Sequence, residues 1–287
     1  MKIKYVNRIG GNQGLRTKKI QANMEIMLKF LNKQYFEQEI YHSLKEGNFQ
    51  FVYQPQYCLN TNNIIAGEAL IRWNHPTFGQ ISPEHFIPLC EKFGLIIPLG
   101  EWVIEKACQQ LQFWHSKGHK LKLCVNLSFG QLYQQNFIEM ISKIIKKTKV
   151  DPAYLELELT ETMTGNDTEN FTSIIDDIRK LGIRVALDDF GVGYSSLSYL
   201  TFLNVDLIKI DKSIINKINE SKKHRAVFVA IVALAKNLNL EVVVEGIETK
   251  EQMELIKNLG CNIMQGFYFS KPIRENEFEN LLLRMNK

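Results

Sequence analysis

From Phe51 onward, short runs of apolar and β-branched residues alternate with longer stretches of helical period. This alternation predicts repeated βα units and a parallel sheet. The runs expected to form strands are 50–54, 65–72, 121–127, 154–160, 182–188, 206–210, 241–245 and 262–268. Eight such runs over about 220 residues fit an α/β fold of the TIM-like (β/α)8 barrel type better than an open doubly wound sheet.

Glycines mark several of the expected helix ends. Gly118, Gly182 and Gly260 each follow a stretch of helical period directly. A glycine at that place is typical of a helix C-cap that leads into the next strand. No GxGxxG follows the first strand and no GxxxxGK[ST] occurs, so neither a Rossmann nor a P-loop nucleotide site is supported.

Charge is unevenly distributed along the chain. The net charge is +4, but residues 1–34 carry eight Lys or Arg against the single acid Glu25, a local +7 that leaves −3 for the rest. We interpret residues 1–34 as a basic, partly helical N-terminal extension or linker, and residues 35–287 as the folded domain. A basic arm could instead contact nucleic acid, anionic lipid or an acidic partner.

The cysteines and the lengths of the apolar stretches indicate the cellular compartment. The five cysteines are scattered and form no CxxC, so neither a zinc ribbon nor a disulfide framework is indicated. No stretch reaches the length of about 18 apolar residues that a transmembrane helix needs, and no secretory signal is evident. We therefore expect a soluble protein in a reducing cytoplasm.

Acidic and amide side chains recur at the carboxyl ends of the expected strands, where barrel active sites are built. A single charged residue there is usually just solvated, but recurrence over seven consecutive strands favours a site. Hard oxygen donors without histidine or thiolate suit Mg²⁺ or Mn²⁺ better than zinc. The residues concerned are Glu68, Asn126, Glu158, Glu161, Asp188, Asp189, Lys209, Asp211, Glu245, Glu248 and Gln265.

Asp188 and Asp189 are adjacent at the end of the fifth strand. In a continuous strand they would point to opposite faces, but the glycines at 191 and 193 bend the chain and let both carboxylates turn inward. Two such anions raise each other's pKa unless a cation lies between them. We therefore expect a metal ion bridged by Asp188; the alternative is an ordinary Asp-Gly turn.

Glu156 and Glu158 share one face of the fourth strand and alternate with three leucines. In a closed barrel the leucines would pack against the outer helices and the glutamates would point into the interior. An unpaired carboxylate there is costly, so these glutamates require a metal or a cationic partner. Lys209 is the candidate partner.

The motifs taken together resemble the EAL family. Glu68-Ala69-Leu70 lies in the setting YQPQ…GEALIRWNHP, and the other motifs follow in the family's order and spacing over about residues 36–280: VNLS at 125–128, ELTET at 158–162, DDFGVGYSSL at 188–197, IKID at 208–211, EGIET at 245–249 and QGFYFSKP at 265–272. The resemblance implies a metal-dependent phosphodiesterase that hydrolyses cyclic di-GMP to the linear dinucleotide pGpG by two-metal activation of water. Such an enzyme lowers a second messenger that controls biofilm and motility behaviour.

The resemblance also assigns roles to residues of this chain. It implies one metal held by Glu68, Asn126, Glu158 and Asp188, and a second held by Asp188, Asp189 and Glu245. Lys209 would help to activate the attacking water, Gln265 would position it, and Glu161 would anchor the loop that starts at Asp189. The substrate contacts would be Gln54, Leu70, Arg72 and Asp211. The metals would be Mg²⁺ or Mn²⁺, two per site, with Ca²⁺ inhibitory.

Three positions depart from the family pattern: Val192 replaces a Thr, Asn262 replaces an Asp and Phe267 replaces a Tyr. Val192 lies in the loop that, in the family, links the metal site to the dimer interface, so the departure bears on coupling and basal rate.

The resemblance implies a homodimer formed through this domain, no binding of DNA, and an upstream or separate regulatory partner. Residues 5–13 vaguely resemble the end of a diguanylate cyclase domain.

Three other functions compete with this interpretation. The first is a module that binds cyclic di-GMP without hydrolysing it. The second is an unrelated metal-dependent barrel enzyme that acts on small enolisable acids. The third is a protein-interaction regulator that keeps the fold without binding nucleotide.

Overall fold

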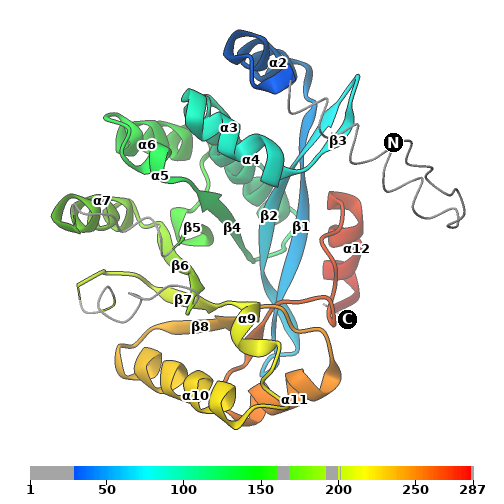
Figure 1. The fold of residues 1–287 in the computed structure, drawn as a ribbon, viewed down its shortest axis with the longest axis vertical. Coiled ribbons are helices and arrows are strands. Elements are labelled where there is room, and N and C mark those ends of the chain that lie inside the picture. The colour runs from blue at the N-terminus through cyan, green and yellow to red at the C-terminus, as the bar shows by residue number, and fades with distance from the viewer. Residues whose placement is uncertain (1–28, 161–167, 192–199, 201, 286–287) are drawn as a thin grey trace, which may run out of the picture.

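The strands form a closed barrel with helices on its outside (Figure 1). The computed structural model describes residues 29–160, 168–191, 200 and 202–285. The sheet order is β1-β9-β8-β7-β6-β5-β4-β2-β3, and an additional β1–β2 pairing closes a ring of eight strands. The strands are β1 Phe49–Cys58, β2 Asn63–His75, β3 Gly79–Ile81, β4 Lys122–Leu127, β5 Leu155–Thr160, β6 Arg184–Phe190, β7 Leu207–Ile210, β8 Glu241–Val244 and β9 Ile263–Met264.

Helices connect most of the strands and cover the outer surface of the barrel. They are α2 Lys33–Glu46, α3 Pro83–Phe93, α4 Ile96–Ser116, α5 Phe129–Leu132, α6 Phe137–Thr148, α7 Thr168–Lys180, α9 Lys212–Ile215, α10 Lys222–Asn237, α11 Lys250–Asn258 and α12 Glu275–Met285. The predicted TIM-like barrel is therefore confirmed, and each of the eight expected strands overlaps one strand of the ring.

The first strand corrects the prediction of a uniformly parallel sheet. β1 runs antiparallel to both β2 and β9, while the pairings from β2 through β4 to β9 are parallel. Only residues 59–62 connect β1 to β2, and a parallel pair needs a crossover of about a dozen residues or more. Asn62 makes the reversal with φ +54. A short extra strand, β3, pairs antiparallel with the far end of β2 and was not predicted.

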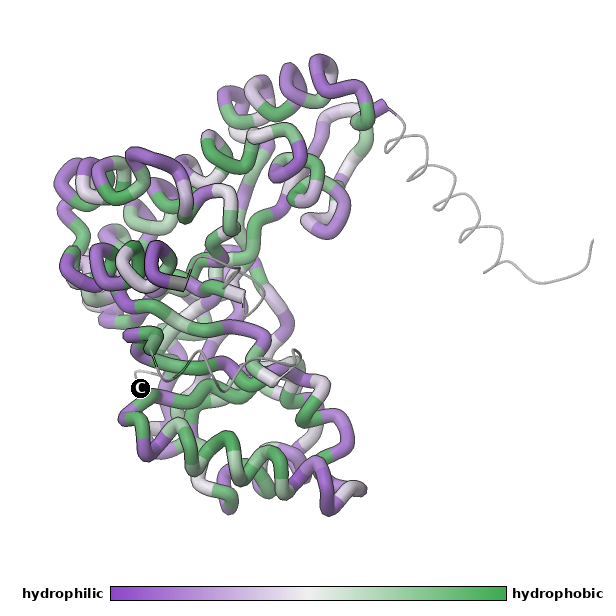
Figure 2. The backbone as a smooth tube through the Cα atoms, turned by 60° about the vertical axis from the view of Figure 1, so that its left-hand side comes forward, coloured by the Kyte–Doolittle hydropathy of each residue, from purple (hydrophilic) through white to green (hydrophobic). Residues whose placement is uncertain are grey.

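The fourth predicted strand, β5, shows how the barrel separates its two faces. Its leucines at 155, 157 and 159 are buried in the apolar cluster between the sheet and the outer helices. Glu156 and Glu158 are 2% and 1% exposed and lie on the inner face. Figure 2 shows hydrophobic positions concentrated on the strands and on the helix sides that face them. The predicted inward direction of both glutamates is confirmed.

A second apolar cluster joins helix α2 to the end of strand β2. The ring of Phe30 is fully buried and stacks on Trp73 at a centroid distance of 5.3 Å, and the Trp73 indole donates a 2.8 Å hydrogen bond to Ser43 Oγ. Residues from Phe30 onward thus pack against the barrel. The division of the chain between residues 34 and 35 stays a prediction.

The glycines expected at three helix ends adopt the conformation of a helix C-cap. Gly118, Gly182 and Gly260 have φ of +88, +86 and +91, the left-handed conformation of a C-cap. All five cysteines are free thiols. Among the described residues, no helix has the length and apolar character that crossing a membrane requires.

Truncating the buried leucine layer tests this packing. Leu157→Ala removes a fully buried side chain and leaves a cavity between β5 and the helices, so we expect the free energy of unfolding to fall by about 2–5 kcal/mol. Urea denaturation measures the loss. Leu283→Ala, at an exposed position of α12, is the matched control and should change stability by about 0.5 kcal/mol or less. Equal losses in the two variants would contradict the described core.

Candidate active site

Lys209 of β7 lies at the centre of a group of four carboxylates inside the mouth of the barrel. Its side chain is fully buried. Its Nζ lies 2.7 Å from Glu245, 2.8 Å from Glu158, 3.3 Å from Asp188 and 3.7 Å from Glu68. These four acids come from four different strands or strand ends, so only closure of the barrel brings them together.

The strand register sets the depth of this group. Asn126 and Glu158 are direct neighbours across the parallel pair β4–β5, and Thr160 and Asp188 are direct neighbours across β5–β6. Because parallel strands point their carboxyl ends the same way, side chains two residues apart form successive layers at one mouth. We refer to Glu68, Glu158, Asp188, Glu245 and Lys209 as the carboxylate ring.

Amide side chains hold the Glu68 carboxylate in place. Asn126 Nδ2 donates a 2.9 Å hydrogen bond to Glu68 Oε1. Gln265 Nε2 donates to Glu68 Oε2 at 2.6 Å and to Gln54 Oε1 at 3.1 Å, and Gln54 Nε2 donates to the Ser270 carbonyl. Both oxygens of Glu68 are therefore oriented by residues that the sequence analysis had placed at the site.

The two adjacent aspartates separate in depth. Asp188 is 7% exposed and faces Lys209, whereas Asp189 is exposed at the rim. Asp189 takes φ +55 within a register shift of β6 against β7, and its own N–H donates to Asp188 Oδ1 at 2.9 Å. The bend thus begins at Asp189 itself, before the glycine at 191. The predicted inward direction is confirmed for Asp188, which contacts Lys209. Asp189 lies at the rim within electrostatic reach of Asp188, Lys209 and Glu68.

Burial and mutual repulsion set the protonation of the ring. Burial raises the pKa of Glu158 well above its ordinary value, and Glu68, Asp188 and Glu245 add to the rise. Burial likewise raises the pKa of Glu245 to about 7. Lys209 opposes both shifts, and its own pKa is raised by the acids although burial acts against this. One ammonium therefore leaves an excess of negative charge when all four acids ionise.

The pKa of Glu68 is lowered, in contrast to the raised pKa values of Glu158 and Glu245. Burial would raise its pKa, but Lys209 and the hydrogen bonds from Gln265 and Asn126 lower it. Asp189 at the rim has a raised pKa through burial and the nearby charge of Asp188. Ionised Glu68 thus lies beside acids that hold their protons more tightly.

The donor set of the ring fits divalent cations of the Mg²⁺ type. Glu158 Oε2 and Gln265 Oε1 are buried oxygens that accept no hydrogen bond within the described part of the chain. Together with the carboxylates and the Asn126 amide they supply oxygen donors alone, which is the set that hard cations prefer. A cation would also neutralise the excess charge that Lys209 leaves uncompensated.

A second group of possible ligands lies one layer deeper. Ligand atoms of Cys124, Glu156 and Glu158 lie within 4.8 Å of one another. Burial and the two glutamates raise the pKa of the Cys124 thiol well above its usual range, and Arg184 Nε already donates to Glu156 at 3.1 Å. Because the thiol keeps its proton and Glu156 has a cation, the ring above it is the better metal site.

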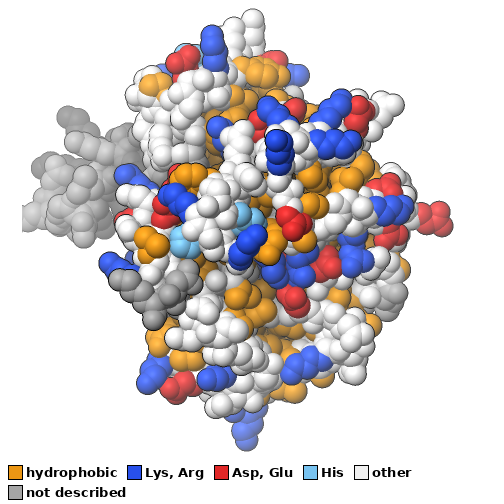
Figure 3. All heavy atoms as spheres, turned by 180° about the vertical axis from the view of Figure 1, so that it is seen from behind, with side chains coloured by type: hydrophobic (Ala, Val, Ile, Leu, Met, Phe, Trp, Pro, Cys, Tyr) orange, Lys and Arg blue, Asp and Glu red, His pale blue; other side chains and the backbone are white. Residues whose placement is uncertain are grey.

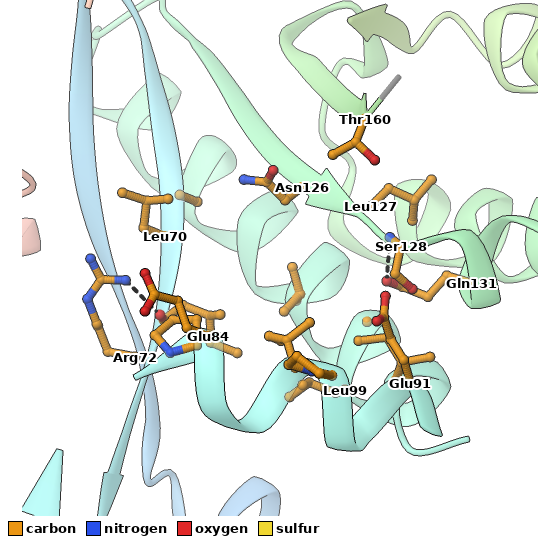
Figure 4. Close-up of a pocket in the computed structure, with 18 of the residues that line it drawn as sticks. Leu70, Arg72, Glu84, Glu91, Leu99, Asn126, Leu127, Ser128, Gln131 and Thr160 are labelled. Carbon is orange, nitrogen blue, oxygen red and sulfur yellow. Dashed lines mark hydrogen bonds between the residues drawn. The ribbon is translucent and has the colours of Figure 1, made fainter. Parts of the chain in front are cut away.

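A cavity of about 410 Å³ opens beside the ring. Figure 4 shows Leu70 and Arg72 of β2 on one side of it, with Asn126 close by and the acidic side chains of Glu84 and Glu91 on helix α3. Most of its other lining is aliphatic. A cavity of this size and composition suits one planar base next to a phosphate held at the ring.

The remaining predicted site residues lie at the rim or outside the described residues. Asp211 caps α9, accepting a 2.7 Å hydrogen bond from Ser213 N, and its charge contributes to the raised pKa of Asp189. Glu248 is exposed. Glu161 and Val192 are not among the described residues.

Two features of the site were not anticipated from the sequence. Arg184 is the partner of Glu156, whereas Lys209 was expected to serve both glutamates. The sequence did indicate an inward Arg184, because this residue precedes Asp188 by four positions and so lies on the same face of the strand. No sequence pattern predicted that Glu84 and Glu91 of α3 line the cavity, because their position next to β2 depends on tertiary packing.

The raised pKa values predict an unusual pH dependence of stability for the metal-free protein. Between about pH 4.5 and 7 the folded state retains protons on Glu245 and Glu158 that the unfolded chain loses, so stability falls as pH rises. Glu68 acts in the opposite sense at lower pH. We expect urea denaturation in chelator to show a loss of about 1–3 kcal/mol across this window. Glu245→Gln should flatten the profile; a flat profile in the unsubstituted protein would contradict the assignment.

Comparison with known proteins places this geometry in a family. The sequence model described as "EAL domain" matches residues 37–272. MucR of Pseudomonas aeruginosa, named a bifunctional diguanylate cyclase/cyclic di-GMP phosphodiesterase, is 36% identical over 88% of this chain and 36% of its own length. The cyclic di-GMP phosphodiesterase NbdA of the same organism is 33% identical over 90% of this chain and 33% of its own. The chain thus spans about a third of the length of these curated relatives.

Solved structures agree with the sequence comparison. The MucR phosphodiesterase in complex with cyclic di-GMP superposes with a TM-score of 0.78 and 36% identity over 83% of this chain and 99% of that one. The EAL enzyme Bd1971, bound to cAMP and cyclic di-GMP, gives a TM-score of 0.81 and 30% identity over 94% of this chain and 73% of its own. With the barrel, the carboxylate ring and the family match in agreement, this chain belongs to the EAL domain family.

Proposed function

We propose that this chain is a metal-dependent phosphodiesterase that hydrolyses cyclic di-GMP to linear pGpG. The observation that carries the proposal is the carboxylate ring, in which Lys209 contacts three buried acids and the partly buried Glu245. Relatives named cyclic di-GMP phosphodiesterases and the cyclic di-GMP complex of a 36% identical domain support the choice of substrate. Hydrolysis would lower this messenger and so alter biofilm and motility behaviour.

The ring and its neighbours would hold two divalent cations, Mg²⁺ or Mn²⁺. Glu68, Asn126, Glu158 and Asp188 would hold one, and Asp188, Asp189 and Glu245 the other. When bound, the pair would neutralise the phosphodiester, activate water and stabilise the leaving oxygen. Ca²⁺ is larger and accepts looser geometry, so we propose that it occupies the site and inhibits.

The chain's own residues would bind and orient the substrate. Arg72 lines the 410 Å³ cavity and feels the charge of Glu68, and its planar guanidinium suits a phosphate oxygen pair. Leu70 and the aliphatic lining would cover one face of a base, and Glu84 or Glu91 would accept its N–H groups. Gln54 reaches the ring through Gln265, and Asp211 lies at the rim where the second nucleotide would extend.

Lys209 and Gln265 would act on the attacking water. Lys209 stays an ammonium because its pKa is raised, so it favours the anionic form of a water at the ring. Gln265 Oε1 is buried without a partner among the described residues and can accept a hydrogen bond that orients that water. We propose that Glu161 anchors the loop that begins at Asp189.

The proposed location, oligomeric state and regulation of the protein follow the pattern of the family. We propose a cytoplasmic protein, in keeping with five free cysteines, that pairs as a homodimer through this domain and takes its control from an upstream or separate partner. Residues 1–34 would serve as the linker. Lys and Arg side chains are intermingled with Asp and Glu on the face in Figure 3, which gives no support to DNA binding there.

Replacing one ring acid tests the proposal. Purified protein with Mg²⁺ or Mn²⁺ should convert cyclic di-GMP to pGpG, and Glu68→Gln should lower kcat by about 100-fold or more because a ligand charge is lost. The readout is chromatography of the products. Glu139→Gln, an exposed glutamate of α6, is the control and should leave the rate unchanged. Nucleotide binding without turnover in the unsubstituted protein would select the binding-module alternative.

Competition between protons and metal predicts the pH profile. At limiting Mn²⁺, hydrolysis should rise between about pH 6 and 8, because Glu245 and Glu158 must lose protons before they bind a cation. Raising the Mn²⁺ concentration should move the rise to lower pH, and chelator should abolish activity. If the pH dependence of hydrolysis did not change with the Mn²⁺ concentration, these acids would not be metal ligands.

A further inference from the structure

A second charged layer lies directly beneath the carboxylate ring. Its centre is Glu156, which is 2% exposed inside the barrel and precedes Glu158 by two residues on β5. Arg184 of β6 donates from Nε to Glu156 Oε2 at 3.1 Å, and the Cys124 thiol donates to Glu156 Oε1 at 3.2 Å. Both oxygens of this buried acid are therefore engaged.

The two layers lie close together. A carboxylate oxygen of Glu156, one of Glu158 and the Cys124 sulfur all lie within 4.8 Å of one another. Two buried carboxylates at that separation repel strongly unless each has a cation. In the structure the cations are divided: Arg184 pairs with Glu156, and Lys209 pairs with Glu158.

Arg184 is itself held from the opposite end of the barrel. Its NH2 lies 2.8 Å from Glu241 Oε2, and Lys122 Nζ lies 3.4 Å from the same oxygen. Arg184 and Glu241 stand at the amino ends of β6 and β8, away from the mouth. A column of alternating charge therefore runs from that end up to Glu156, where the planar guanidinium is fixed in one orientation.

The Cys124 thiol lies beside Glu156 on the neighbouring strand β4 and adds no charge to this layer. It accepts a 3.6 Å hydrogen bond from Gln56 Nε2 while donating to Glu156. It is fully buried. A protonated thiol at this place satisfies one oxygen of Glu156 but cannot neutralise it, so the charge of Glu156 is balanced by Arg184.

We propose that Arg184 is a positioning residue for the phosphodiesterase reaction, and that its pairing with Glu156 leaves Lys209 to the carboxylate ring. This inference rests on the proposed function. Without Arg184, the buried charge of Glu156 would draw the Lys209 ammonium downward, away from Glu245 and Asp188. The ring would then lose the geometry in which it binds cations and orients water.

The test compares a single substitution with a charge-balanced pair of substitutions. Arg184→Met should weaken Mn²⁺ affinity and lower kcat, each by about 10- to 100-fold, with the KM for cyclic di-GMP changed much less. Arg184→Met combined with Glu156→Gln removes both charges and should restore most of the Mn²⁺ affinity. Electron paramagnetic resonance of free Mn²⁺ measures the affinity independently of turnover.

A matched control removes an ion pair on the outside of the barrel. Arg179 pairs with Asp206 at 2.8 Å. Arg179→Met therefore removes a similar ion pair but should leave the Mn²⁺ affinity within about twofold of that of the unsubstituted protein. Arg184→Lys, which keeps the charge, should retain more Mn²⁺ affinity than Arg184→Met.

The outcomes separate this inference from the proposed function. Wild-type Mn²⁺ affinity in Arg184→Met, or a double variant no better than the single one, would overturn the positioning role. If Arg184→Met does not fold, the double variant decides alone: wild-type Mn²⁺ affinity supports the inference and a large loss overturns it. If the unsubstituted protein binds Mn²⁺ but leaves cyclic di-GMP intact, the proposed function fails while the affinity comparison still decides the role of Arg184.

Discussion

The site depends on one buried ammonium. Lys209 Nζ reaches four carboxylates within 3.7 Å, and the desolvation of so many charges is favourable only if they compensate one another. One lysine cannot balance four acids. Burial, and after it repulsion from the other acids, raises the pKa values of Glu158 and Glu245, and divalent cations would relieve the repulsion. The same arrangement that is costly in the metal-free protein therefore prepares the site for metals.

The barrel makes this arrangement possible by giving each strand two unlike faces. On β5 the outward leucines join the main apolar cluster, while Glu156 and Glu158 occupy successive layers inside. The interior thus holds ion pairs at the mouth and below it, beside a small apolar cluster of Ala186, Leu207 and Val243, whereas a typical barrel of this type is packed with branched aliphatic side chains. Glu68 reaches the ring from β2, whose hairpin with the antiparallel β1 closes the sheet.

Much of the fold and of the site could be predicted from residue order. Period-two alternation identified the inward glutamates, and polar residues at strand ends identified the ring. The antiparallel β1 was missed although residues 55–64, between the first two predicted strands, are already fewer than the roughly dozen residues of a parallel crossover. The pairing of Glu156 with Arg184, and of Glu158 with Lys209, could not be predicted. It depends on how deep each side chain lies inside the barrel relative to those on the other strands. The αL conformation of Asp189 was likewise set by the β6 bulge, beyond the reach of local pattern.

Anomalous X-ray scattering from crystals grown with Mn²⁺ tests the central claim most directly. We predict two anomalous peaks at the mouth of the barrel, one contacted by Glu68, Asn126, Glu158 and Asp188 and the other by Asp188, Asp189 and Glu245. Arg184 should remain on Glu156 in the same map. A peak at Cys124 and Glu156, or a ring without any peak at saturating Mn²⁺, would contradict the claim.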